Sequence, residues 1–75
     1  MWKYEIECEA SIERKKYTEV FDVRRVEFVT GVEELSEGLW CFRVAFHSGL
    51  TSMFSWTENI QTERERARLI NAVWK

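Results

Sequence analysis

The sequence predicts a small α+β domain in which a four-stranded antiparallel meander carries a C-terminal helix on its apolar face. Three observations predict this fold. Residues 2–12 alternate apolar and polar side chains without a break, and residues 39–56 contain two further alternating runs, which is the period of a strand. Residues 62–74 repeat apolar side chains at helical spacing. We expect residues 1–75 to form one small domain.

The opening run defines an apolar face at its even positions and an acidic face at its odd positions. A two-residue loop at Arg14-Lys15 would join it to a second strand. That loop would place apolar residues opposite one another, namely Ile12 with Tyr17, Cys8 with Phe21 and Ile6 with Val23.

The alternation changes phase after Val23, because the next apolar residues are Val26 and Phe28. An extra residue at Arg24-Arg25, as in a β-bulge, would restore it. Tyr4 would then face Val26, and Trp2 would face Phe28. Residues 30–38 contain two glycines and three glutamates, and this composition predicts an exposed connection.

The third and fourth strands form the second predicted hairpin. A three-residue loop, His47-Ser48-Gly49, with the glycine in the left-handed region would place aromatic side chains opposite each other. The expected pairs are Phe46 with Leu50, Phe42 with Phe54 and Trp40 with Trp56.

The chain is expected to end in a helix. Thr62 and Glu65 fit a capping box, while Thr57 is an alternative, earlier start. The predicted apolar stripe contains Ala67, Ile70, Val73 and Trp74, with Leu69 at its edge, and the expected ion pairs are Glu63 with Arg66 and Glu65 with Arg68.

The lengths of these elements do not match. A strand of about 12 residues spans roughly 40 Å, whereas a helix of about 13 residues spans roughly 20 Å. Either the sheet curls around the helix, or a second subunit covers the remaining apolar face. This comparison favours a homodimer.

Composition excludes several classes of protein. An apolar fraction of 45% predicts a folded domain, and a net charge of −2 gives no attraction to nucleic acid or to an acidic membrane. No membrane span and no signal peptide are indicated, so we expect a cytoplasmic protein. Cys8 and Cys41 should lie on opposite faces of the sheet and remain free thiols in a reducing compartment.

The residue types that support catalysis are scarce. His47 is the sole histidine and lies at a predicted hairpin tip, where little shields a reaction from water. Neither zinc-ligand spacing nor a glycine-rich phosphate loop is present. We therefore expect no enzyme activity, no cofactor and no metal, and hydrolysis around His47 is the weakest hypothesis.

The acidic face of the first strand is the candidate binding surface. Glu5, Glu7 and Glu9 project from it together, and Arg24 or Arg25 should lie near Glu5. Such a row is typical of a solvated face. It is also compatible with a docking patch for another protein and, less well, with a site for a hard cation.

Two functions from different classes fit this pattern. The leading hypothesis is a small non-enzymatic protein-interaction module, of the kind a phage or bacterial accessory protein would use to bind a host or cellular protein. An open sheet edge would be a second docking surface. The alternative is nucleic-acid binding through Arg14, Lys15, Lys16 and the helix arginines Arg64, Arg66 and Arg68.

Overall fold

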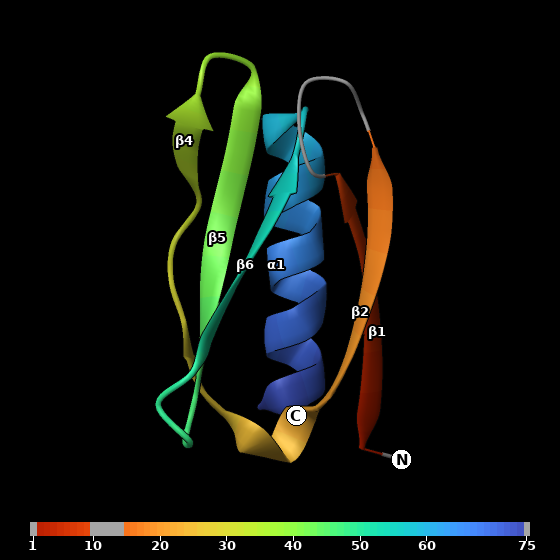
Figure 1. The fold of residues 1–75 in the computed structure, drawn as a ribbon, viewed down its shortest axis with the longest axis vertical. Helices are drawn as coiled ribbons and strands as arrows, with labels where there is room; N and C mark the ends of the chain where they lie inside the picture. The colour runs from red at the N-terminus through yellow and green to blue at the C-terminus, as the bar shows by residue number, and fades with distance from the viewer. Residues whose placement is uncertain (1, 10–14, 75) are drawn as a thin grey trace.

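The computed structural model describes residues 2–9 and 15–74, and all structural statements concern these ranges. Along the chain it contains six strands, one short 3₁₀ turn and a C-terminal helix (Figure 1). The strands are β1 (Lys3–Glu9), β2 (Lys16–Asp22), β3 (Val26–Val29), β4 (Glu33–Ser36), β5 (Leu39–Phe46) and β6 (Thr51–Trp56); the 3₁₀ turn is Val23–Arg25, and the helix is α1 (Asn59–Val73).

The α+β class, the antiparallel pairing and the C-terminal helix are confirmed, but the four-stranded meander is wrong. The described strands form two sheets. One contains β1 and β2. In the other, β6 pairs with one edge of β5, while β3 and β4 pair with different parts of its length. The two sheets lie on either side of α1, and β6 crosses in front of the helix (Figure 1).

The first hairpin has a different register from the predicted one. Tyr4 faces Phe21 and Cys8 faces Tyr17, so the predicted pairs are displaced by four residues. Because four is even, the same side chains still point to the core. Glu9 faces Lys16, which excludes a two-residue loop at Arg14-Lys15. Ile12 and Arg14 lie outside the described residues.

The predicted bulge at Arg24-Arg25 is a 3₁₀ turn that takes the chain from one sheet to the other. The Asp22 carboxylate accepts a hydrogen bond from the Arg24 main-chain N–H at 2.9 Å and so caps the turn. Val26 then faces Phe46 of β5. The predicted pairs Tyr4–Val26 and Trp2–Phe28 are therefore wrong, because a change of phase in the sequence fits a change of sheet as well as a bulge.

The segment 30–38 is not a connection throughout, since β4 occupies Glu33–Ser36. All four of its side chains are exposed, so it lacks the alternation by which a strand is recognised in sequence. A tight turn joins it to β5. Gly38 lies in this turn with a φ of +77°, a conformation that glycine adopts at little cost.

The β5–β6 hairpin is confirmed in register and in turn. Phe42 faces Phe54, and Trp40 faces Trp56. The main-chain N–H of Phe46 donates to the Leu50 carbonyl at 2.9 Å, which closes the three-residue loop. Gly49 has the expected left-handed conformation, with a φ of +92°.

The helix begins earlier than the predicted Thr62 cap. α1 starts at Asn59, close to the alternative start at Thr57. Thr62 is fully buried one turn inside, where its hydroxyl donates to the Glu58 carbonyl at 2.7 Å. A threonine satisfied by its own helix can pack against the core, so the capping-box pattern is not used here.

The buried stripe of α1 is also rotated relative to the prediction. Leu69, predicted at the edge, is fully buried, whereas Ala67 and Trp74 are exposed. The Glu65–Arg68 ion pair forms at 3.5 Å. The Arg66 guanidinium instead donates to the Thr30 carbonyl at 2.6 Å, which ties the helix to the segment between β3 and β4.

The core lies between the helix and the two sheets. It contains buried side chains from both sheets, from the 3₁₀ turn and from α1, namely Tyr4, Ile6, Cys8, Val23, Val26, Phe42, Val44, Phe54, Trp56 and Leu69. Phe21 of β2 packs against Phe46 and Phe54, with ring centroids 5.5 and 6.0 Å apart. The sheets thus curl around the helix, and covering this face does not require a second subunit.

The alternation predicts that the aromatic residues lie in the interior, but not all of them do. Trp2 and Phe28 are both more than half exposed. Trp2 lies at the start of the described chain, where the Arg24 guanidinium stacks on its ring at 4.7 Å. Phe28 faces Ala45 on the side of its sheet away from the helix.

Candidate functional site

Side-chain donors of β6 link the two sheets along a seam between β1 and β6. The Trp56 indole N–H donates to the Glu7 carbonyl at 3.0 Å, and the Ser55 hydroxyl donates to the Glu9 carbonyl. The Glu9 carboxylate accepts from the main-chain N–H and the hydroxyl of Thr57, at 3.1 and 3.2 Å. The Glu7 and Glu9 carbonyls face away from β2. They thereby gain hydrogen-bond partners in β6 side chains rather than in the main chain of a neighbouring strand.

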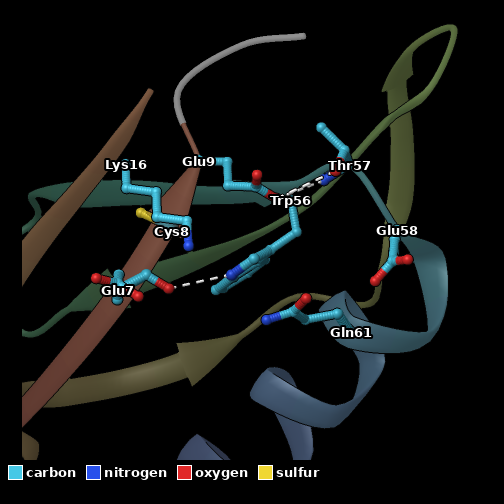
Figure 2. Close-up of a pocket in the computed structure, with 8 residues that line it drawn as sticks. All are labelled: Glu7, Cys8, Glu9, Lys16, Trp56, Thr57, Glu58 and Gln61. Atoms are coloured by element: carbon cyan, nitrogen blue, oxygen red, sulfur yellow. Dashed lines mark hydrogen bonds between the residues drawn. The ribbon is translucent and has the colours of Figure 1, made fainter. Parts of the chain in front are cut away.

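A pocket of about 400 Å³ opens at this seam, where β1 and β6 end and α1 begins. Figure 2 shows the Trp56 ring at its centre, with the Gln61 amide below it and the Glu9–Thr57 hydrogen bonds above. The lining residues are Glu7, Cys8, Glu9, Lys16, Trp56, Thr57, Glu58 and Gln61.

The charged groups at the pocket are three carboxylates and one ammonium group. Glu9 is half-buried and committed to Thr57, whereas Glu7 and Glu58 are exposed. Neither Glu7 nor Glu58 belongs to any of the three ion pairs found among the described residues. The site therefore presents two available carboxylates, and its electrostatic preference is for a positively charged group.

The pocket lacks an activated nucleophile or base within the described residues. Burial raises the pKa of the Cys8 thiol, which keeps it protonated, and a protonated thiol is a poor nucleophile. Burial likewise raises the pKa of Tyr17, which faces Cys8 across the β1–β2 pair. His47 lies in the turn at the far end of β6. In residues 2–9 and 15–74, no three metal-ligating side chains are grouped to hold an ion.

Both cysteines are free, as predicted, and both are buried. We expect neither thiol to react with Ellman's reagent within minutes in the folded protein, because burial raises the pKa of each. Both should react at once in a denaturant. A thiol that reacts rapidly and stoichiometrically without denaturant would contradict the described packing.

The structure separates the predicted site residues into two groups. Glu5 and Glu7 are exposed on β1, as expected, but Glu9 bonds to Thr57 and stabilises the chain between β6 and α1. Arg24 and Arg25 lie in the 3₁₀ turn beyond the opposite end of the β1–β2 pair. The residue opposite Glu5 in β2 is Val20, so the expected arginine neighbour is wrong.

Arg24 binds Asp22 instead. Its guanidinium contacts both carboxylate oxygens, with the shortest N–O distance 2.7 Å. Side-chain hydrogen bonds from Arg24, followed by its main-chain N–H, lower the pKa of Asp22 to about 2. The Arg24 side chain is therefore already paired with Asp22 and does not pair with Glu5. The main-chain carbonyl of Arg25 accepts from the His47 N–H at 2.9 Å.

Sequence reasoning missed Trp56, Glu58 and Gln61 as parts of this site. Trp56 was expected only as a core residue opposite Trp40, and the other two lie in a segment whose helix start was misplaced. The polar run Thr57-Glu58-Asn59 directly after a strand was the available signal, because helix starts adjoining a strand end often line binding sites.

No family model matches this sequence, and comparisons with curated proteins and with solved structures gave no match. None of the described helical residues forms a segment with the length and apolar character that crossing a membrane requires. Any assignment of function therefore depends on the geometry of the site.

Proposed function

We propose that this chain is a non-enzymatic protein-interaction module that binds a basic, partly apolar segment of another protein at the pocket between β1, β6 and α1. The observation that carries this proposal is the pair of available carboxylates, Glu7 and Glu58, at a pocket large enough for a side chain. Figure 2 shows Glu7 and Glu58 on opposite sides of the Trp56 ring, so a partner segment would meet each carboxylate with a lysine or arginine side chain of its own.

An apolar residue lies beside this acidic site and supports a protein as the partner. Ile60 is 74% exposed and lines a shallow hollow that shares Glu58 and Gln61 with the pocket. A segment with a cation near an apolar side chain could contact both parts. Exposed large apolar residues next to polar groups are characteristic of protein-binding surfaces.

The nucleic-acid alternative has less support. Among the helix arginines, Arg66 donates to the Thr30 carbonyl, and Arg68 pairs with Glu65 and stacks on the Tyr4 ring at 5.5 Å. Arg14 lies outside the described residues. The carboxylates beside Lys16 in the pocket would also repel a phosphate backbone.

The test is quantitative affinity capture from lysate by three forms of the protein. The Glu7→Lys/Glu58→Lys double variant reverses both pocket charges, and Glu27→Lys reverses an exposed carboxylate on β3 as the control. We expect one set of proteins to be retained by the wild type and by Glu27→Lys, and to be reduced at least about tenfold with the double variant.

Two results would overturn the proposal. Equal retention by all three forms would show that the pocket does not take part in the interaction. Retention that is lost after nuclease treatment would favour the nucleic-acid alternative.

The two free thiols suit the cytoplasmic setting that we propose for this interaction.

A further inference from the structure

The outer edge of β2 carries main-chain groups that no other described strand pairs. The Val23 N–H donates to the Trp2 carbonyl, while the Glu7 and Glu9 carbonyls accept from β6. Even residues of β1 therefore direct their main-chain groups to β2, and odd residues direct theirs away from β2. With the observed register, the groups that point outward from β2 belong to residues 16, 18, 20 and 22.

Two copies of this edge fit each other in one antiparallel register around a two-fold axis through Glu19. Lys16 then faces the second copy's Asp22, and Thr18 faces the second copy's Val20. All four outward residues of β2 exchange main-chain hydrogen bonds in this register. A displacement by two residues would leave one of them opposite a residue beyond the strand and separate Lys16 from Asp22.

The side chains of this edge complement themselves. The register brings opposite charges together at both ends, where Lys16 of each copy meets the other copy's Asp22, a carboxylate that also binds its own Arg24. Between them, Val20 is 51% exposed in the single chain and would pack against Thr18 of the second copy. Oppositely charged and β-branched pairs across strands are stabilising.

The same register places the two copies of Glu19 opposite each other at the centre. Like charges facing across a strand pair are destabilising, so this contact weakens the association without changing its geometry. Because the Glu19 contact weakens the association, the test must reach high protein concentrations. On the same side of the joined sheets, Tyr17 would face Phe21 of the second copy.

We infer that β2 forms a reversible two-fold dimer with a second copy of this chain, which joins the two β1–β2 sheets into one four-stranded sheet. The inference does not depend on the proposed function, since it uses a second copy of the chain and the outer edge of β2.

The test is light scattering after size exclusion across a concentration series up to about 1 mM. The mass should rise toward twice the monomer mass of 9.1 kDa. Val20→Lys should raise the dissociation constant at least about tenfold, because a lysine on an edge strand blocks strand pairing. Leu50→Lys, at a residue that is 71% exposed in the β5–β6 turn, adds the same charge elsewhere and should leave the constant unchanged.

A monomer at every concentration, or equal shifts from the two lysine variants, would overturn the inference. Circular dichroism melting checks that both variants fold.

A second measurement tests the register. Glu19→Cys should form a covalent dimer on mild oxidation, because directly opposed residues of a non-hydrogen-bonded antiparallel pair lie about 4.5 Å apart at Cα. Cross-linking no faster than with Thr51→Cys, an exposed position on β6, would also overturn it.

Discussion

The Ile6→Glu variant is expected to be unfolded at room temperature. Ile6 is fully buried in the centre of β1, and its side chain belongs to the core shared by the sheets and the helix. A carboxylate there would lose its hydration without gaining a partner, at a cost of several kcal/mol. A chain of 75 residues has about 4–11 kcal/mol of total stability, so this cost removes much or all of it. Loss of the far-ultraviolet circular dichroism melting transition is the measurement.

Glu7→Lys is the matched control, because it changes the neighbouring residue on the opposite face of the same strand. Glu7 is exposed, and its link to β6 uses its main-chain carbonyl rather than its side chain. We expect its free energy of unfolding to stay within about 0.5 kcal/mol of the wild type. A folded Ile6→Glu or an unfolded Glu7→Lys would contradict the assignment of the two faces of β1.

The Trp56→Ala variant should lose about 3–5 kcal/mol of stability. Trp56 is almost completely buried, stacks on Phe42 with ring centroids 5.6 Å apart, and donates its indole N–H to the Glu7 carbonyl. Removing it creates a cavity in the core and also breaks a link between the sheets. Urea unfolding followed by circular dichroism measures the loss.

Trp56→Phe separates these two contributions. Phenylalanine keeps most of the ring but not the donor, so the Glu7 carbonyl loses its partner at a cost of about 1–2 kcal/mol. Trp74→Phe is the control, since Trp74 is 53% exposed and should change stability by less than about 0.5 kcal/mol. Equal stability of Trp56→Phe and the wild type would show that the indole hydrogen bond does not hold the sheets together.

Glu9 shows how the seam alters the interpretation of the acidic row. In sequence it is equivalent to Glu5 and Glu7, two residues apart on the same strand face. In the structure its carboxylate bonds to Thr57, which is 48 residues away, and this bond fixes the entry to α1. Of the three glutamates, Glu7 is the one that remains exposed at the pocket.

The sequence alone determined the faces of β1 and the whole β5–β6 hairpin. Alternation is a local property: each strand residue points to the side opposite its neighbour, so Ile6 is inside and Glu7 outside whichever strand lies beside them. The β5–β6 register was also predictable, because a short loop with one glycine at its left-handed position allows few alignments of the flanking aromatic residues.

Only the tertiary structure decided which strands pair, where α1 begins and which residues form the pocket. The apolar phase change near Arg24 fits either a bulge or a change of sheet, and only packing against β5 selects between them. β4 is exposed throughout and exists because β5 offers it an edge. The pocket joins residues 7–9 and Lys16 with residues 56–58 and Gln61. Hydrogen bonds between distant segments hold it together, and no local periodicity encodes such contacts.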